Sequence, residues 1–329
     1  MLAAIIPARD EARYIGRALD SLAGTQVIVV DDNSSDATAE IACEHGATVV
    51  NGRLLPPGWT GKLWALSQGI EVTAASRPDY LLLTDADIVH GPGIVSALVT
   101  KAEQDGFDLV SLMVLLRTES FAEKALIPAF VFFFLMLYPP SWIESPRHRT
   151  AGAAGGCIVI RREALERIGG IETIRGELID DCALARAVKQ SGGRVWLGLT
   201  RDTRSIREYG GFGEIWRMIS RTAFTQLKYS PLLLCATLVG LAVTFLFPPL
   251  LALTFRPVAG TIGAAAWLAL SIAYAPMLRF YRRSLLWAPT LPLIALFYAG
   301  ATIDSAIRYW IGRGGAWKGR SQALRTPVK

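Results

Sequence analysis

The C-terminal third of the chain constrains the fold most, because it is too apolar to form the surface of a soluble protein. Residues 231–303 contain only four charged residues, all arginines that fall between the apolar runs: Arg256, Arg279, Arg282 and Arg283. The stretch is long enough for several membrane spans. Three are predicted, at Leu232–Phe255, which Pro248 and Pro249 break, at Val258–Leu278 and at Leu285–Ile303.

Positive charge near these spans predicts their orientation. The loop Arg279–Arg283 and the tail at residues 306–329 are both basic, and basic segments beside spans stay in the cytoplasm. Three full crossings cannot leave both segments on one side of the membrane. Either the third span, which carries Pro289 and Pro292, is re-entrant, or the tail is an exception to the rule.

The start of the chain has the character of a soluble domain. A strand is expected to begin at Leu2 without a basic leader, so no signal peptide is expected. The four cysteines form no C-x-x-C pair. This spacing argues against a zinc site or a disulfide framework and favours reduced thiols that face the cytosol.

Strands and helices alternate over the first 205 residues, a pattern typical of an α/β domain with a parallel sheet. The helical segments carry apolar residues at helical spacing. Strands are predicted at Leu2–Ile6, Gln26–Val30, Thr48–Asn51, Tyr80–Leu83, Ile158–Ile160 and Arg194–Leu199.

Two of these strands end in paired carboxylates, Asp31 with Asp32 and Asp85 with Asp87. Alternate side chains of an extended chain point to the same side, and open α/β sheets bind ligands beyond the carboxyl ends of their strands. Carboxylate oxygens suit Mg²⁺ or Mn²⁺. The alternative is an Asp-rich turn that caps the next helix. Two acidic strand ends in one sheet favour the catalytic interpretation.

Two further polar motifs stand at predicted helix starts. Gly61 and Lys62 can offer backbone N–H groups and a cation to an anionic ligand, although Lys62 can equally be a solvated surface lysine. Asp180 and Asp181 open the helix Cys182–Ser191. One carboxylate there is explained by the helix dipole. A second exceeds what capping needs and can supply a general base.

An apolar run at Ala125–Tyr138 stops at two prolines and is too short to cross a bilayer comfortably. We favour a helix on the membrane surface over a buried core helix, since the basic residues Arg147–Arg149 follow it. Later, Gly155 and Gly156 allow a ligand to approach the backbone closely. The amphipathic helix Gly213–Gln226 then leads into the apolar third and carries Arg217 and Arg221.

Taken in order, these motifs resemble those of family 2 glycosyltransferases with the GT-A fold. The matching stretches are Pro7-Ala8-Arg9-Asp10-Glu11, Val30–Asp36, Gly61-Lys62, Thr84-Asp85-Ala86-Asp87 and Asp180-Asp181-Cys182-Ala183-Leu184. With Gly58–Ala65 and Trp317-Lys318-Gly319-Arg320, the chain looks similar to the hopene-associated membrane glycosyltransferases. It lacks the Q-x-x-R-W signature of processive synthases.

The resemblance implies a role for each matching position. The donor nucleotide-sugar would contact Pro7, Ala8, Arg9, Glu11, Asp32, Lys62, Asp85 and Ala86. Asp85 and Asp87 would hold Mg²⁺ or Mn²⁺. Asp181, beside Asp180, would be the general base, and the acceptor side would include Gly155, Gly156, Arg217 and Arg221.

The resemblance also implies the reaction and its setting. We expect an inverting, metal-dependent hexosyl- or N-acetylhexosaminyltransferase that moves a sugar from a UDP-sugar to a membrane lipid. A hopanoid-related lipid is the first expectation for the acceptor, and polyprenyl phosphate is the alternative. No nucleic-acid partner is expected. A nucleotidyltransferase would need a glycine-rich loop after the first strand, which Pro7–Glu11 lacks. A non-catalytic scaffold would be free to lose its aspartates.

The expected organisation is therefore a membrane enzyme with a cytoplasmic catalytic domain at the inner (plasma) membrane. The predicted boundaries are residues 1–205 for the GT-A domain, with an interfacial apolar segment at 125–140, then 206–230 for an amphipathic interface helix, 231–305 for the multi-pass transmembrane region and 306–329 for the basic tail.

Overall fold

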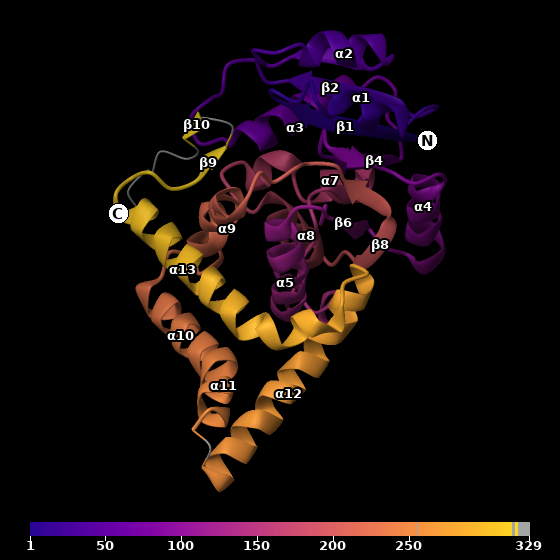
Figure 1. Cartoon of the computed structure of the whole chain (residues 1–329). Coiled ribbons are helices and arrows are strands. Elements are labelled where there is room, and N and C mark those ends of the chain that lie inside the picture. Colours follow the sequence, from indigo (N-terminus) through magenta and orange to yellow (C-terminus); the bar gives the residue numbers. More distant parts are fainter. Residues whose placement is uncertain (255, 318–319, 322–329) are drawn as a thin grey trace. The chain divides into compact units, whose positions relative to one another are not determined.

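The computed structural model describes residues 1–254, 256–317 and 320–321. The chain forms two compact units (Figure 1). The first comprises Met1–Arg117 and Tyr138–Arg207, together with the described residues from Ala316 onward, and the second comprises Thr118–Leu137 and Glu208–Gly315. The residues of the predicted tail at 318–319 and 322–329 lie outside the described part of the chain.

A mixed sheet of eight strands forms the centre of the first unit, in the order β3-β2-β1-β4-β7-β6-β8-β5. The strands are β1 (Leu2–Ala8), β2 (Gln26–Asp31), β3 (Thr48–Asn51), β4 (Tyr80–Thr84), β5 (Ile88–Val89), β6 (Leu109–Leu115), β7 (Cys157–Arg161) and β8 (Val195–Ser205). The first four are parallel, as the strand–helix–strand pattern predicts. β7 runs antiparallel to both of its neighbours, β4 and β6. Beyond them β8 is parallel to β6, and the short edge strand β5 is antiparallel to β8.

Helices cover both faces of this sheet. The helices of the first unit are α1 (Ile15–Asp20), α2 (Thr38–Glu44), α3 (Gly61–Val72), α4 (Ile94–Asp105), α6 (Pro140–Glu144), α7 (Arg162–Arg167) and α8 (Asp180–Gln190), with a 3₁₀ turn at Ile171–Ile174. Apolar residues of α1, α2 and α4 share one core cluster with alternate residues of β1, β2, β4 and β6. α3 lies on the opposite face, where Gly69 packs so closely that a Cβ there would lie 2.4 Å from Ile5 Cγ2. The result is a three-layer α/β/α fold.

The sequence predicts the strands of the first half well but misses parts of the second. The prediction contains neither β5 nor β6, and it ends the last strand at Leu199, whereas β8 continues to Ser205. Charged residues beyond Leu199 suggest a loop. In the structure this stretch pairs with β5, since Val89 lies opposite Arg204. The extension matters because it brings Ser205 and Arg207 to the candidate site.

The second unit is helical. Its helices are α5 (Phe121–Leu137), α9 (Phe212–Gln226), α10 (Pro231–Leu241), α11 (Phe247–Ala252), α12 (Pro257–Phe280) and α13 (Leu291–Trp310), with a π-helical turn at Ala242–Leu246 and a 3₁₀ turn at Leu285–Thr290. The predicted break at Pro248 and Pro249 takes the form of the π-helical turn just before them, so α10 and α11 stay joined. Such turns re-satisfy backbone groups that proline disturbs in apolar helices.

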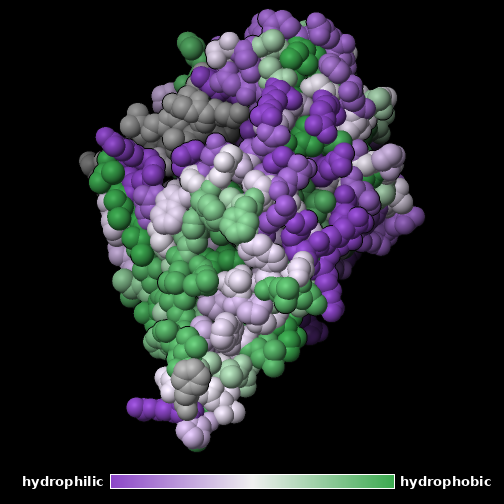
Figure 2. Space-filling view, in the orientation of Figure 1, coloured by the Kyte–Doolittle hydropathy of each residue, from purple (hydrophilic) through white to green (hydrophobic). Residues whose placement is uncertain are grey.

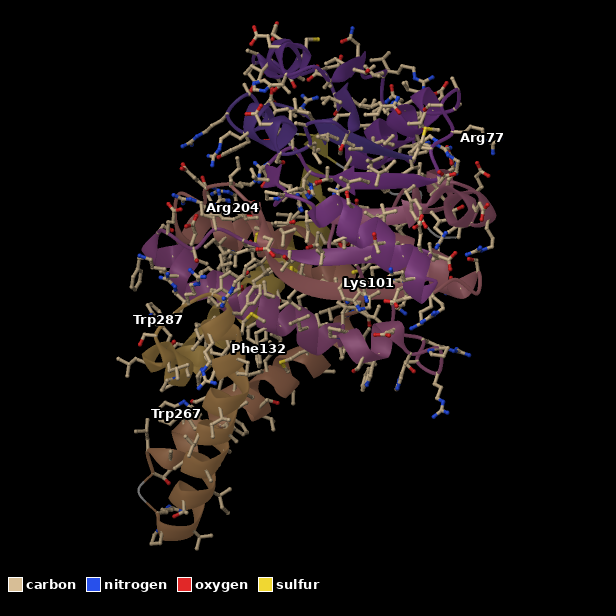
Figure 3. The ribbon with its side chains drawn as sticks, turned by 90° about the vertical axis from the view of Figure 1, so that its right-hand side faces the viewer. Arg77, Lys101, Phe132, Arg204, Trp267 and Trp287 are labelled. Carbon is tan, nitrogen blue, oxygen red and sulfur yellow. The ribbon has the colours of Figure 1, made fainter. Side chains whose placement is uncertain are left out.

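Aromatic rings join the helices of this unit. Phe132 lies 5.3 Å from the Tyr274 ring, and Phe133 lies 5.5 Å from the Phe245 ring, as measured between ring centroids. The Trp267 indole N–H donates to the Pro289 carbonyl at 3.0 Å. Figure 3 labels Phe132, Trp267 and Trp287 on these elements. Two of the four phenylalanines of the apolar run therefore pack against aromatic rings of other elements.

Four helical stretches among the described residues are long and apolar enough, by length and composition, to cross a membrane. They are Phe121–Glu144, Pro231–Ala252, Pro257–Phe280 and Leu285–Trp310. The last three correspond to the predicted spans, and the first adds a candidate that the sequence analysis considered too short. Apolar side chains crowd the visible surface of these C-terminal helices (Figure 2). Val258, Leu286 and Leu293, on these stretches, are all more than two-thirds exposed. Such surfaces are typical of a membrane protein.

The sheet itself excludes a single crossing by the first of these stretches. β6 precedes Phe121–Glu144 in the chain and β7 follows it, yet the two strands pair with each other in one sheet. A helix that crossed the bilayer once between them would place the two strands on opposite sides. The chain must therefore leave and re-enter the first unit on the same side of any membrane.

Candidate active site

The candidate residues lie at one edge of the sheet because of the directions in which the strands run. β1, β2 and β4 are parallel, so their carboxyl ends share that edge. β7 is antiparallel to β4 and pairs its first residue, Cys157, with Thr84, the last residue of β4. The loop before β7 therefore lies beside the loop after β4. Asp85, which is predicted to lie on the donor side, and Gly155, which is predicted to lie on the acceptor side, meet there although they are far apart in the sequence.

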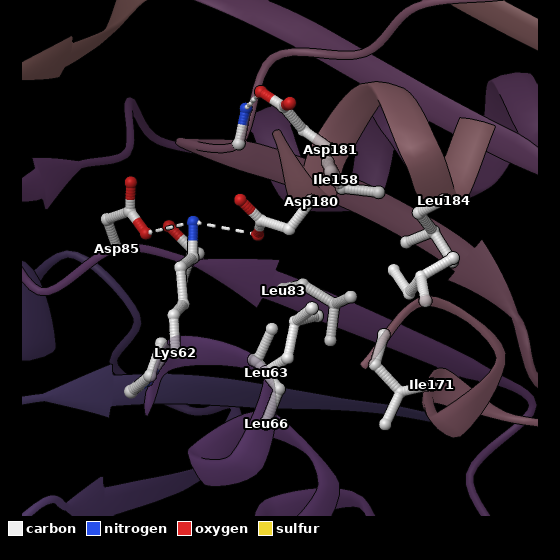
Figure 4. A pocket seen from close by; sticks show the side chains of 14 residues that line it. Lys62, Leu63, Leu66, Leu83, Asp85, Ile158, Ile171, Asp180, Asp181 and Leu184 are labelled. Carbon is white, nitrogen blue, oxygen red and sulfur yellow. Dashed lines mark hydrogen bonds and ion pairs between the residues drawn. The ribbon is translucent and has the colours of Figure 1, made fainter. Parts of the chain in front are cut away.

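Lys62 stands between two of the motifs. Its ammonium nitrogen lies 3.0 Å from Asp85 Oδ1 and 3.2 Å from Asp180 Oδ2 (Figure 4). The Lys62 side chain is 19% exposed. Burial lowers the Lys62 pKa, but the charges of Asp180, Asp85 and Asp181 outweigh burial and leave the pKa above its usual value. Lys62 is therefore a fixed cation in the site rather than a solvated surface lysine.

Asp181 is held by backbone amides. The Gly155 N–H donates to Asp181 Oδ2 at 2.8 Å, and the Cys182 N–H donates to Oδ1 at 2.7 Å. Burial and the neighbouring charge of Asp180 raise the Asp181 pKa to about 6, against the opposing effects of Lys62 and the two N–H groups. A carboxylate with a pKa near the working pH suits a general base.

These charged groups stand over an apolar floor. The residues that line the pocket with Lys62 are Pro7, Leu63, Leu66, Leu83, Thr84, Asp85, Gly155, Ile158, Ile171, Ile174, Asp180, Asp181 and Leu184. A Cβ added to Gly155 would lie 3.1 Å from the Lys62 ammonium and 3.3 Å from Asp181 Oδ2. The absence of a side chain at Gly155 thus leaves room between the cation and the candidate base.

Thr84 ties the two loops together. Its hydroxyl donates to the Gly156 carbonyl at 2.7 Å, and its oxygen lies 3.0 Å from His90 Nε2. His90 is 4% exposed, and burial lowers its pKa to about 4. A neutral imidazole is therefore expected at neutral pH. The contact fixes the glycine loop against the end of β4.

Asp87 belongs to a second charged cluster, which the sequence analysis did not find. Ser205 donates its hydroxyl to Asp87 Oδ2 at 2.5 Å, and Arg207 Nη2 lies 3.2 Å from Asp87 Oδ1. The same Arg207 nitrogen lies 2.6 Å from Glu11 Oε1. Asp85 and Asp87 thus share a strand end but pair with different cations. No local pattern around Arg207 or Ser205 signals this contact, because it joins residues 118 positions apart.

The first loop closes over the end of β2. Arg9 Nη1 donates to the Asp32 carbonyl at 2.7 Å and lies 3.6 Å from the Asp32 carboxylate. Asp10 has a φ of 52° and accepts from the Ser35 N–H at 2.8 Å. Asp32 is 2% exposed. The loop and the acidic stretch after β2 therefore form one connected group, and their donor-binding assignment stays a prediction.

The remaining predicted site residues differ in whether they line the pocket. Pro7 lines the pocket, whereas Ala8 and Ala86 are buried in the core. Arg217 and Arg221 lie on α9 in the second unit and are absent from the pocket lining among the described residues. Their acceptor-side assignment stays a prediction.

The carboxylate oxygens of the site are suitable ligands for a hard divalent cation. Among the described residues, no group of three or more His, Cys, Asp or Glu side chains gathers as a metal cage. Mg²⁺ and Mn²⁺ do not require one, because one or two carboxylates together with substrate phosphates suffice. Asp85, whose side chain is 38% exposed, and Asp87 supply such carboxylates at one strand end.

The fold and this arrangement define a class of protein, and a family comparison agrees. The model of glycosyl transferase family 2 matches residues 3–169, about half of the chain. The chain therefore belongs to this family and has its GT-A fold. Among solved structures, a mannosyltransferase from Pyrobaculum calidifontis in complex with GDP-Man and Mn²⁺ superposes with a TM-score of 0.57 and 20% identity, over 94% of this chain and 86% of the other.

Curated relatives match in sequence over shorter stretches. A 4,4'-diaponeurosporenoate glycosyltransferase of Staphylococcus haemolyticus is 40% identical over 93 residues, which are 26% of this chain and 24% of that protein. An uncharacterized protein of Methanocaldococcus jannaschii is 33% identical over 108 residues, which are 32% of this chain and 43% of that protein. The match spans less than half of either relative.

Proposed function

We propose that the protein transfers a sugar from a nucleotide diphosphate sugar to a hydroxyl of a membrane lipid, with inversion and with a divalent cation. The observation that carries the proposal is the position of Asp181. Its carboxylate has a raised pKa of about 6, is oriented by two backbone amides and faces the same pocket as Lys62 and Asp85. A base opposite a donor site is what a single displacement requires.

The donor side consists of charges that match a nucleotide diphosphate. Asp85 and Asp87 would hold Mg²⁺ or Mn²⁺, which when bound would neutralise the leaving diphosphate. Lys62 lies 3.0 Å from Asp85 and adds a cation beside the same position. Arg9 and Asp32 order the first loop, where the base and ribose are expected. The mannosyltransferase of similar fold, in complex with GDP-Man and Mn²⁺, supports a nucleotide-sugar and a divalent cation without deciding between UDP and GDP.

The acceptor is proposed to be a lipid because of the apolar helices. α5 follows directly after the first part of the catalytic unit, and three further stretches are apolar enough to cross a membrane. The relative named for 4,4'-diaponeurosporenoate supports a lipid-like acceptor class. A hopanoid-related lipid stays our first prediction, with polyprenyl phosphate as the alternative.

We further propose that the catalytic unit faces the cytoplasm at the plasma membrane. The division into catalytic domain, interface helix, transmembrane region and basic tail is part of this proposal. The joined helix α10–α11 and the helix α12 would form a hairpin that crosses the membrane twice. α5 cannot cross once, for the reason given by the pairing of β6 with β7. α13 would then be re-entrant or interfacial, since Ala316 groups with the first unit.

The test of activity uses the full chain purified in detergent. UDP-sugars and GDP-sugars are supplied with Mn²⁺ and a bacterial lipid extract, and release of the nucleoside diphosphate and labelling of lipid are both measured. We expect lipid-dependent release with one donor, and release slowed by about 10²–10⁴-fold in Asp181→Asn. If the protein instead releases pyrophosphate when a nucleoside triphosphate and a sugar phosphate are supplied together, it is a nucleotidyltransferase. No turnover under any condition, with a folded protein, would indicate a non-catalytic scaffold.

The lipid path is tested at the exposed end of α5. Met136 and Leu137 are 52% and 58% exposed, whereas Phe132 and Phe133 pack against other rings. The double variant Met136→Ser and Leu137→Ser should fold, hydrolyse donor slowly and label lipid poorly. Full lipid labelling by this variant would rule out acceptor entry along that end of the helix.

A further inference from the structure

Both carboxylate oxygens of Asp87 are already engaged by groups of the protein. The Ser205 hydroxyl donates to Oδ2 at 2.5 Å, and Arg207 Nη2 contacts Oδ1 at 3.2 Å. Asp87 is 5% exposed. A divalent cation can therefore bind Asp87 only if at least one of these two contacts is replaced.

The contact with Arg207 is the one that a cation has to overcome. Arg207 supplies one positive charge to two buried carboxylates, because its Nη2 also lies 2.6 Å from Glu11, which is 5% exposed. Its guanidinium carbon lies 5.3 Å from the centre of the Tyr14 ring, a cation–π distance. A metal ion that approaches Asp87 meets this resident cation and is repelled by it.

Displacement of Arg207 becomes favourable only when a new anion is supplied. A displaced guanidinium would lose its contact with Asp87. Among the described residues, the other carboxylate in contact with Arg207 is Glu11, and that contact is already made. A nucleotide diphosphate brings several negative charges to the same strand end, and guanidinium groups bind phosphates through parallel hydrogen bonds. Donor binding therefore compensates both for the lost Asp87 contact and for the added metal charge.

We propose that Arg207 is a positioning residue that keeps divalent cations from Asp87 until a nucleotide diphosphate is bound, which makes metal and donor binding cooperative. The proposal rests on the proposed function, in that Asp87 is taken as a metal ligand. It goes beyond that function because it sets an order of binding. Free metal alone loads the site poorly, and donor and metal arrive together.

Asp85, in the neighbouring cluster, does not limit metal access in this way. Asp85 pairs with Lys62 but is 38% exposed, so solvent or a metal can reach it without displacing the lysine. Asp87 is enclosed, and its partner Arg207 is 28% exposed. The control over metal binding therefore lies at Asp87.

The experiment measures Mn²⁺ binding, not turnover. Free Mn²⁺ is quantified by electron paramagnetic resonance with the full-length protein in detergent, with and without UDP, after subtraction of Mn²⁺ bound by UDP in buffer. The variants are Arg207→Gln, Arg207→Lys and, as a matched loss of one positive charge elsewhere, Arg77→Gln. Arg77 is 69% exposed and pairs with Glu166 on the surface of the same unit (Figure 3).

In the wild type, UDP should tighten Mn²⁺ binding by about fivefold or more, the lower end of typical coupling between two ligands. Arg207→Gln should bind Mn²⁺ alone about fivefold more tightly than the wild type and show less enhancement by UDP. Arg207→Lys and Arg77→Gln should both bind Mn²⁺ alone as weakly as the wild type.

Two results would overturn the inference. One is wild-type Mn²⁺ binding that is equally tight with and without UDP, a measurement that needs no variant. The other is a folded Arg207→Gln protein whose affinity for Mn²⁺ alone is unchanged or lower. If the wild type binds no Mn²⁺ even with UDP, the proposed metal-dependent function is wrong as well. If the wild type binds Mn²⁺ but one of the two results above is found, only the inference about Arg207 is wrong.

Discussion

The site contains two clusters in which one cation serves two carboxylates, and they differ in burial. Lys62 contacts Asp85 and Asp180, whose side chains are 38% and 20% exposed toward the pocket. Arg207 contacts Glu11 and Asp87, whose side chains are 6% and 8% exposed. Both clusters lie in the first unit, at the edge where β4 ends.

This difference separates groups that can meet substrate from groups that hold the site together. The carboxylates around Lys62 can exchange a protein partner for a ligand at little cost, because water already reaches them. Those around Arg207 are enclosed, and an unpaired charge there would be expensive. The Lys62 cluster is therefore expected to control chemistry and donor contact, and the Arg207 cluster to control stability and metal access.

The largest effect is expected from the two aspartates that follow β4. Asp85→Ala and Asp87→Ala should each abolish transfer, as should EDTA with the wild type, because both carboxylates are proposed to meet the metal. The variants should differ in stability. Asp87→Ala loses charge-assisted hydrogen bonds worth about 1.5–3 kcal/mol. Asp85→Ala should cost less stability, because Lys62 keeps its contact with Asp180 and the site of the substitution is more exposed.

Two measurements on the full-length protein check these two substitutions. Transfer assays report activity, and chemical denaturation, followed by a signal from the first unit, reports stability. Equal destabilisation by both substitutions would remove the distinction between the clusters. Full transfer in EDTA would contradict the metal requirement in both.

The next effect concerns the base beside the Lys62 cluster. Asp181→Asn should bind donor with near-normal affinity and slow transfer by about 10²–10⁴-fold, the usual contribution of a general base. Asn keeps the size of the side chain and can accept from the Gly155 N–H. Donor titration and single-turnover transfer separate the two quantities. Equal losses in donor binding and in rate would place Asp181 in the nucleotide site instead.

A smaller effect is expected from pH. The base must be ionised, and its pKa of about 6 lies above that of an ordinary aspartate. The rate at limiting substrate should therefore be constant above about pH 7 and fall about tenfold per unit below pH 6, as the carboxylate is protonated. Lys62→Met removes a charge that lowers the Asp181 pKa, so its acidic limb should move to higher pH.

A pH–rate profile of both proteins, with folding monitored across the range, makes this measurement. An acidic limb at the same pH in both would mean that Lys62 does not influence the titrating group. Arg77→Gln, with an exposed charge on the same unit, serves as the control that should not move the limb.

The smallest effect is expected at Ser205. Ser205→Ala removes the hydroxyl that donates to Asp87 but leaves the contact with Arg207 in place. A single hydrogen bond contributes about 0.5–1.5 kcal/mol net, so the melting temperature should fall slightly while transfer persists. Loss of transfer comparable to that of Asp87→Ala would show that the hydroxyl, rather than the guanidinium, positions the carboxylate.

The same comparison shows what the sequence can predict. The Lys62 cluster follows from local patterns, because Asp85, Asp180 and Lys62 each stand at a strand end or a helix start. Parallel strands bring such positions to one edge. These patterns predict an α/β domain with a parallel sheet, whereas the GT-A fold and the proposed donor and base roles were predicted from the resemblance to family 2 glycosyltransferases.

In the Arg207 cluster, the sequence analysis named Glu11 and Asp87 as site residues but missed their partners Ser205 and Arg207. Ser205 and Arg207 follow a stretch, Arg201–Arg204, whose charges suggest a loop. Long-range pairing with β5 and β6 extends β8 through this stretch. The prediction that Pro248 and Pro249 break the first span was also incomplete. Local patterns do not report which long-range pairing stabilises an exposed edge strand.

The pairing of Thr84 with Cys157 also bears on how this architecture can diversify. One rung of the sheet joins the proposed donor half of the site to the proposed acceptor half, and the chain between its two residues includes the whole of α5 and α6. Insertions, deletions or replacements within α5 and α6 leave this rung intact, together with Asp85 and Asp87, which precede α5 in the chain. Descendants of such a gene can therefore acquire a new acceptor while they inherit the old donor chemistry unchanged.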